Sequence, residues 1–199
     1  MRRRSPVSPA AETCERRRSW LSSASLAGHF CVNCGSPLQL RVIEGRDLEA
    51  CPNDDFVLWR DPKVAAAVVV EHAGGIVVGR RAIEPGYGLW CLPGGFVNHD
   101  EDPKDAAVRE CLEEIGARVE LTELLGLYHV AKTTAPSIIG IAYRGRLVDG
   151  EEIRAGSEML ELGVFRPDAL PPLAFPSHRE VLKMYEAAAA GSALRPSRE

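Results

Sequence analysis

The chain has 199 residues, of which 45% are hydrophobic and 26% are charged, a composition typical of a folded globular protein. No apolar run approaches the roughly 20 residues that a membrane helix needs, so we expect no membrane partner. The net charge is −4, and residues 1–28 contribute +4 of it through six Arg and two Glu, which leaves −8 on the rest of the chain. Such an acidic body is unsuited to tight binding of a nucleic-acid backbone, and we expect no nucleic-acid partner.

Residues 1–28 are rich in Arg, Ser and Ala and show no hydrophobic periodicity. This pattern predicts a disordered N-terminal extension or an overlong translation start, and an organelle transit peptide of similar composition is the alternative. No apolar segment follows the basic start, so the six cysteines do not indicate a secreted disulfide scaffold. We therefore predict a reduced, cytoplasmic protein.

Residues 29–60 contain three of the cysteines and predict a small β module. Cys31-x-x-Cys34-Gly looks like the first knuckle of a zinc ribbon, and Cys51 begins a second knuckle after sixteen intervening residues. The fourth ligand position holds Asp54 in place of a cysteine. Three interpretations stay open: Asp54 completes a structural Zn²⁺ site, His29 substitutes for it, or zinc has been lost and packing holds the module.

Residues 61–188 predict an α/β domain in which strands dominate. A Gly-Gly turn separates two strands over 64–72 and 74–82, and a strand or turn over 89–97 precedes a central helix. Further strands are predicted over 118–132, 137–148 and 159–165, with a polar loop over 151–157. A Pro-rich segment over 167–176 leads to a terminal helix from His178, and residues 189–199 predict a flexible tail. The pattern favours a mixed sheet covered by helices.

The central helix has clear end signals. Asp102 can cap its first free N–H groups, Pro103 suits its first position, and Gly116 is a stop signal. At 100° per residue, the helix places its apolar side chains on one face and its glutamates on the other. The apolar face comprises Val108, Cys111, Leu112 and Ile115, and the acidic face Glu110, Glu113 and Glu114.

These three glutamates are poorly placed for the stability of the helix. Glu110 and Glu114 are a like-charge i,i+4 pair, which costs about 0.2–0.5 kcal/mol. All three lie in the C-terminal half, where the helix dipole favours cations, and Arg109 can offset only part of the repulsion by pairing with Glu113. A bound cation would remove the conflict, and carboxylate ligands suit Mg²⁺ or Mn²⁺.

The same stretch resembles the signature of the Nudix hydrolases. The matching positions are Gly95, Glu101, Arg109, Glu110, Leu112, Glu113, Glu114, Ile115 and Gly116 at the family's spacing. Cys111 departs from the usual aliphatic residue and can pack as a small hydrophobe. The lead-in over 88–96 and the segment LAFPSHREVL near the end also resemble a subgroup that carries a Cys-rich module and includes hydrolases of ADP-ribose and FAD. The likeness covers roughly residues 29–187.

The resemblance implies a Nudix-type α/β/α sandwich and a set of metal ligands. These ligands would be Glu110, Glu113, Glu114 and the backbone carbonyl of Gly94, for two to three Mg²⁺ or Mn²⁺ ions. Glu110 is ambiguous, because in different family members the residue at this place binds metal, orients the water or serves as the base. Arg109 and Glu101 would orient the acidic cluster. Related enzymes are often homodimers, so a homodimer is expected.

The resemblance further implies hydrolysis of a diphosphate linkage into two monophosphates. Several family members take the general base from a loop downstream of the signature. Glu158 is our candidate for that base, and a solvated glutamate at a strand edge is the alternative.

Substrate contacts are less specific in the sequence. Tyr87 and Trp90 can stack on a base or flavin ring, although Trp90 also suits the core. Arg80 and Arg81 follow an apolar strand and can meet phosphate, or they are solvated at the strand end. We expect structural roles for His99 and His129, because neither has partners at ligand spacing.

We therefore predict hydrolysis of a nucleoside diphosphate derivative, with ADP-ribose or FAD as the substrate. An NADH pyrophosphatase is the second enzyme hypothesis, but the chain lacks the Ser-Gln-Pro-Trp-Pro-Phe-Pro run that this group shows after the signature. A non-catalytic Nudix-like sensor is the hypothesis from another class. It is disfavoured because such proteins commonly have damaged signatures.

Overall fold

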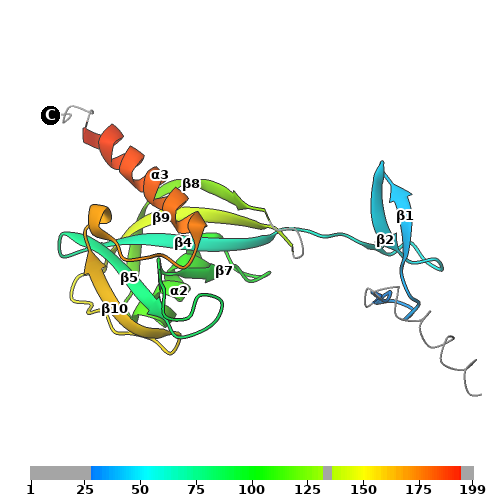
Figure 1. Cartoon of the computed structure of the whole chain (residues 1–199), viewed down its shortest axis with the longest axis horizontal. Coiled ribbons are helices and arrows are strands. Elements are labelled where there is room, and N and C mark those ends of the chain that lie inside the picture. The colour runs from blue at the N-terminus through cyan, green and yellow to red at the C-terminus, as the bar shows by residue number, and fades with distance from the viewer. Residues whose placement is uncertain (1–27, 132–135, 194–199) are drawn as a thin grey trace, which may run out of the picture. The chain divides into compact units, whose positions relative to one another are not determined.

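The computed structural model describes residues 28–131 and 136–193 (Figure 1). The chain divides into two compact units after Arg60, and each is described by itself. The disordered extension predicted for residues 1–28 lies outside the described residues except for Gly28. Within the described part, no helix combines the length and the apolar character needed to cross a membrane.

The first unit is a three-stranded antiparallel sheet in the order β1-β2-β3. Its strands are β1 (Gln39–Ile43), β2 (Arg46–Ala50) and β3 (Val57–Leu58). Between residues 28 and 60, the buried side chains are Cys31, Ala50 and Cys51 alone, while large apolar side chains such as Leu40 and Val42 are more than 70% exposed. The predicted β module is present, but its apolar core is very small.

The second unit is built on a seven-stranded mixed sheet. Its main path runs β10-β5-β4-β9-β8, with β6 paired to β5 and β7 to β4. The strands are β4 (Lys63–His72), β5 (Gly75–Arg81), β6 (Trp90–Cys91), β7 (Gly94–Phe96), β8 (Val119–Val130), β9 (Ile138–Leu147) and β10 (Met159–Phe165). The central pair β4 and β9 is parallel and the other pairs are antiparallel, as the mixed-sheet prediction requires.

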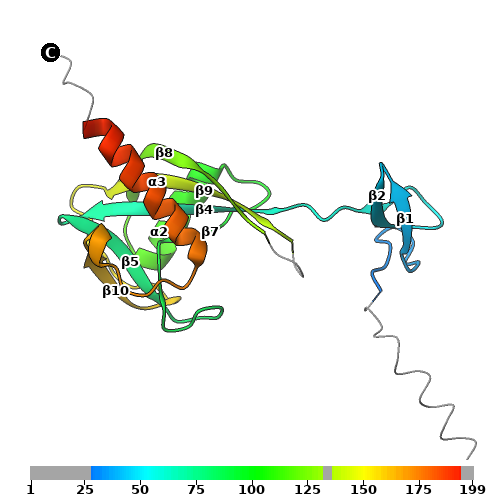
Figure 2. The same ribbon diagram turned by 45° about the horizontal axis from the view of Figure 1, so that its top comes forward.

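Two helices cover opposite faces of this sheet (Figures 1 and 2). Val68 and Val70 of β4 belong to the core cluster that includes Cys111 and Ile115 of α2 (Pro103–Ile115). Val69 belongs instead to the cluster beneath α3 (Pro176–Ala193). Because successive strand residues point to opposite faces, a strand buried on both sides must be apolar throughout. The predicted α/β/α sandwich is therefore confirmed, and it accounts for the unbroken apolar run in β4.

Helix α2 begins and ends at the predicted signals. The Asp102 side chain accepts a hydrogen bond of 2.8 Å from the Lys104 N–H, and Pro103 takes the first helical position. At the other end, Gly116 has a φ of 65° and its N–H donates to the Leu112 carbonyl at 3.1 Å. The helix is thus fixed at both ends by local sequence.

The polar loop before β10 packs against the C-terminal turn of α2. The Arg154 N–H donates to the Ile115 carbonyl at 2.8 Å, and the Gly156 N–H donates to the Glu114 carbonyl at 3.0 Å. A Cβ at position 156 would lie 1.8 Å from the Glu113 carbonyl oxygen, so this approach requires glycine. The two donors satisfy carbonyls that the helix leaves free and bring Glu158 to the acidic end of α2.

Helix α3 extends beyond the predicted boundaries of the terminal helix and of the domain. It begins at Pro176 and continues to Ala193, so residues 189–193, predicted as part of a flexible tail, are helical. The four consecutive alanines at 187–190 have the highest helix propensity of any residue and carry the helix past the domain boundary predicted at 188. The rest of the predicted tail, 194–199, lies outside the described residues.

Candidate functional site

The three glutamates of α2 differ in their exposure to solvent. The Glu110 side chain is 15% exposed and that of Glu113 58% exposed, whereas Glu114 as a whole residue is only 4% exposed. Glu114 lies closest to the sheet, beside the strand β7 that precedes the helix. The acidic face therefore grades from a buried carboxylate to a solvated one.

Arg109 connects the acidic face to the loop before the helix. It donates to both carboxylate oxygens of Glu101, at 2.7 and 3.0 Å, and to Glu110 at 2.8 Å and Glu113 at 3.2 Å. It also donates to the Phe96 carbonyl at 3.1 Å. Hydrogen bonds to Glu101 from the Arg109 guanidinium, which has the larger effect, and from the Asn98 backbone N–H lower the pKa of Glu101 to about 2. Arg109 and Glu101 thus form a charged brace, as expected for orienting residues.

Glu114 lacks a compensating positive charge. Its Oε2 accepts a hydrogen bond of 2.9 Å from the Gly94 N–H, and none of the ion pairs among the described residues includes it. Burial first, and then the charges of Glu110 and Glu158, raise the pKa of Glu114 to about 8. Burial also raises the pKa of Glu110. Arg109 pairs with Glu110 but not with Glu114, and the charge of Arg81 offsets only part of the rise at Glu114, so the site fits a divalent cation that would supply further positive charge.

The glycines of β7 allow this close approach. A Cβ on Gly94 would lie 2.2 Å from the Ala66 carbonyl oxygen, and a Cβ on Gly95 would lie 2.4 Å from the Glu110 carboxylate. Larger residues would push the strand away from both β4 and the acidic face. The Gly94 backbone therefore lies beside Glu114, where its carbonyl was predicted to serve as a ligand.

The three glutamates do not converge on one point in this structure. Among the described residues, only a cluster of three cysteines and an aspartate brings its ligand atoms within 4.8 Å of one another. Glu110 and Glu113 instead share the Nη1 of Arg109. Unscreened like charges separate from one another, and Arg109 holds the outer two carboxylates while Glu114 remains against Gly94.

The structure separates the two arginines predicted to meet phosphate. Arg80 is held by Glu161 at 2.8 Å and by the Gly88 carbonyl at 3.1 Å, on the exposed side of β5. Arg81 is 8% exposed, and its Nε donates to the Pro85 carbonyl at 2.8 Å. Its positive charge lowers the pKa of Glu114, which places the guanidinium within electrostatic reach of the acidic face. Of the two arginines, Arg81 is the one directed to the site.

Other predicted residues take different places. Glu158 is exposed, and its charge contributes to the raised pKa values of both Glu110 and Glu114, after burial, so it borders the acidic face. Tyr87 is 58% exposed. Trp90 packs edge-on against Phe165 at 5.2 Å in the core, as its structural interpretation predicted. His99 and His129 are exposed.

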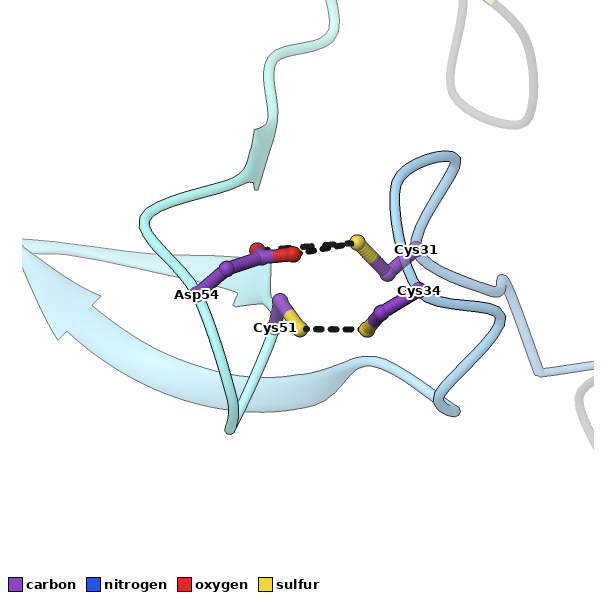
Figure 3. Close-up of side chains that lie close together, drawn as sticks. All are labelled: Cys31, Cys34, Cys51 and Asp54. Carbon is purple, nitrogen blue, oxygen red and sulfur yellow. Dashed lines mark hydrogen bonds between the residues drawn. The ribbon is translucent and has the colours of Figure 1, made fainter.

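The cysteine cluster of the first unit is shown in Figure 3. The Cys31 thiol donates to Asp54 at 3.2 Å, and the sulfurs of Cys34 and Cys51 lie 3.5 Å apart. Backbone N–H groups donate to two of the sulfurs, from Asn33 to Cys31 at 3.4 Å and from Asn53 to Cys51 at 3.3 Å. All four ligand atoms lie within 4.8 Å of one another.

The alternative fourth ligand points elsewhere. His29 Nδ1 lies 3.0 Å from Glu49 Oε1, so its ring pairs with a carboxylate of β2. The hydrogen bond between the Cys34 thiol and the Ser36 hydroxyl lowers the pKa of Cys34, and burial raises that of Cys51 to about 12. The geometry therefore favours Asp54 over His29 as the fourth member of the cluster.

One residue near the site escaped sequence reasoning. The buried His178 of α3 accepts a hydrogen bond of 3.1 Å from the Leu92 N–H, two residues before Gly94. The two residues are 86 positions apart, and no local pattern links them.

Comparisons with known proteins find relatives of both the sequence and the fold. The NUDIX domain model matches residues 61–185. An ADP-ribose pyrophosphatase of Methanocaldococcus jannaschii is 32% identical over 158 residues, which cover 78% of this chain and 89% of that protein. The NAD-capped RNA hydrolase NudC of Pseudomonas aeruginosa is 28% identical over 77% of this chain, which spans about half of that protein's length (52%). A crystal structure of a NUDIX hydrolase from Nitrosomonas europaea superposes with a TM-score of 0.70 at 31% identity, covering 85% of this chain and 96% of that one.

The substitution Glu114→Gln tests whether the Glu114 carboxylate binds a divalent cation. In metal-free protein, the raised pKa means that ionised Glu114 destabilises the folded state, and that stability falls as the pH rises from the unfolded value near 4.3 toward 8. Gln removes this loss, so we expect the variant to be more stable by about 1–3 kcal/mol at pH 8 and by less at pH 5. Thermal melts with and without Mn²⁺ measure both effects. Stabilisation of the variant by Mn²⁺ equal to that of the wild type would contradict the cation role.

Proposed function

The chain belongs to the NUDIX family of pyrophosphohydrolases, and on that basis we propose that it hydrolyses the diphosphate linkage of ADP-ribose or FAD. The observation that carries the proposal is the buried, uncompensated Glu114 beside Glu110 and the Arg109–Glu101 brace. ADP-ribose is supported by the relative that aligns over most of both chains. FAD is supported by the sequence resemblance to the subgroup that carries a Cys-rich module.

In the proposed mechanism, the chain supplies a binding site for Mg²⁺ or Mn²⁺ and places the substrate against it. Glu110, Glu114 and the Gly94 carbonyl would hold the cations, with Glu113 at the solvent side. When bound, two to three divalent cations neutralise the diphosphate and acidify the attacking water. Arg109 orients the carboxylates, since it bonds Glu101, Glu110 and Glu113 together.

Arg81 would contact the phosphates. Its charge lies within reach of Glu114, its Nε is held by the Pro85 carbonyl, and its guanidinium lies over the Phe175 ring at 5.0 Å, so a phosphate would meet an arginine that is already oriented. Arg80 is already paired with Glu161, so we assign it a structural role. Tyr87 is exposed enough to stack on an aromatic part of the substrate.

We propose Glu158 as the general base. It is exposed to solvent, and its charge reaches Glu110 and Glu114, so it borders the face where the attacking water would lie. The loop that carries it is fixed to α2 through Arg154 and Gly156. Glu158 would accept the proton of the attacking water, and the leaving phosphate departs as a monophosphate.

The relative named as a NAD-capped RNA hydrolase favours a second candidate, the diphosphate of a nicotinamide dinucleotide. Because residues 29–199 carry a net negative charge, we favour a free nicotinamide dinucleotide over a capped RNA as the substrate. The homodimer and the cytoplasmic location stay predictions.

A substrate panel tests the proposed function. Purified protein is incubated with Mg²⁺ or Mn²⁺ and ADP-ribose, FAD, NADH or a nucleoside triphosphate, and the monophosphate products are quantified. We expect kcat/KM to be highest for ADP-ribose or FAD, with AMP among the products. Highest activity on NADH would support the second candidate, and no turnover on any member would favour the non-catalytic sensor.

The substitution Glu158→Gln tests the proposed base. Removing a general base costs typically 10²–10⁴-fold in rate, so we expect kcat to fall by at least about 100-fold while Mn²⁺ binding is unchanged. Glu161→Gln, three positions after Glu158 and paired with Arg80 on β10, is the matched control and should retain activity. Full activity in the Glu158 variant would assign the base elsewhere.

We also propose that Cys31, Cys34, Cys51 and Asp54 hold one structural Zn²⁺. Their ligand atoms lie within 4.8 Å of one another, and two of the sulfurs accept backbone N–H bonds, which orient them within the cluster. Among its described residues, the unit buries only two of these cysteines and Ala50. Such a small apolar core needs a further stabilising element, such as a disulfide or a metal ion. Metal coordination would supply the missing stability.

Elemental analysis of purified protein tests this zinc site. We expect close to one equivalent of zinc in the wild type, loss of zinc in Asp54→Ala, and slower release to a chelator in Asp54→Cys, because thiolates bind Zn²⁺ more tightly than a carboxylate. Asp55→Ala, the exposed neighbour, serves as the control. A wild-type content below about a tenth of an equivalent would reject the proposal.

A further inference from the structure

Residues 172–174, which precede α3, run alongside strand β6. Strand β6 leads into the Leu92–Gly94 turn, which connects it to β7. The Trp90 N–H donates to the Pro172 carbonyl at 3.2 Å, and the Ala174 N–H donates to the Trp90 carbonyl at 2.7 Å. Trp90 and Leu173 form a parallel bridge. The segment that precedes α3 is therefore hydrogen-bonded to β6 through its backbone.

Two residues further on, the backbone N–H of Leu92 is bonded by the side chain of His178 and no longer by the backbone of this segment. The Leu92 N–H donates to His178 Nδ1 at 3.1 Å, and both residues are buried, at 1% and 8% exposure. The ring of Phe175 packs edge-on against the imidazole at 5.1 Å and fixes its orientation. Since Nδ1 accepts the bond, a neutral ring carries its proton on Nε2. Burial, followed by the charge of Arg81, lowers the pKa of His178 to about 4, which keeps Nδ1 free to accept.

The three residues from Leu92 to Gly94 are each held by a different partner. The Pro93 carbonyl accepts from the Val68 N–H of β4 at 2.9 Å, and the Gly94 N–H donates to Glu114 at 2.9 Å. The bond at Leu92 is the one supplied by α3. Without this bond, the buried Leu92 N–H would have no partner. The Leu92–Gly94 turn would then no longer be held on the side that faces α3.

We propose that His178 is a positioning residue that holds the Leu92–Gly94 turn in register with Glu114, and so sets the affinity of the site for divalent cations. The inference rests on the proposed function, because it takes the Gly94 carbonyl and Glu114 as cation ligands. Partners that orient metal ligands commonly contribute 10–100-fold to metal affinity. The C-terminal helix is then part of the metal site although it supplies no ligand.

Two variants of this residue separate positioning from packing. His178→Leu fills the space without an acceptor, and His178→Asn places an amide oxygen near the position of Nδ1. We expect His178→Leu to weaken Mn²⁺ binding by about 10–100-fold, measured by electron paramagnetic resonance of free Mn²⁺, and His178→Asn to restore most of it. Arg179→Ala, the exposed neighbour, should bind Mn²⁺ as the wild type does.

Each result of this experiment bears on the proposal. Wild-type Mn²⁺ affinity in a folded His178→Leu variant would overturn it, as would equal loss of affinity in the Leu and Asn variants at equal melting temperatures. In the wild type, NMR should show the Nε2–H tautomer and a Leu92 amide protected from exchange. An Nδ1–H tautomer would overturn the proposal even if neither variant folds. Because Mn²⁺ binding is read without substrate, failure of the substrate panel would leave this inference standing.

Discussion

The arrangement of the second unit depends on the burial of Glu114 at the edge of its core. A carboxylate with 4% exposure and one backbone donor is costly unless a positive charge is added. The surrounding structure holds this arrangement in place. The apolar face of α2 is anchored in the sheet through Cys111 and Ile115, the glycines of β7 admit the acidic face, and Arg109 balances the outer carboxylates. The buried carboxylate itself would be a liability in a helix selected for stability alone.

The two units achieve stability in different ways. The second has apolar clusters on both faces of a seven-stranded sheet. The first exposes several of its large apolar side chains and gathers its thiols around Asp54. In the second unit a cation would serve the chemistry, whereas in the first it would serve the fold.

How much the sequence predicts depends on the range of the interaction. The ends of α2 follow from Asp102, Pro103 and Gly116, because caps act within one turn. The acidic face follows from helical periodicity. The choice between Arg80 and Arg81 does not, since it depends on which side of β5 faces the site. His178 was invisible because its contact joins positions 86 apart. The alanines at 187–190 are helical as the sequence predicts, and they carry α3 across the domain boundary predicted at 188 to its end at Ala193.

The parallel pairing of β4 with β9 also determines when the site can be assembled during synthesis. All of the glutamates of α2 precede Ile138, where β9 begins, yet β4 has no parallel neighbour until that strand has been made. The bond from Leu92 to His178 must wait for the last quarter of the chain. A nascent chain on the ribosome therefore carries its acidic face for some time before the sheet that buries Glu114 is complete. The bonds that complete the site therefore involve residues made well after its signature, although that signature lies in the middle of the sequence.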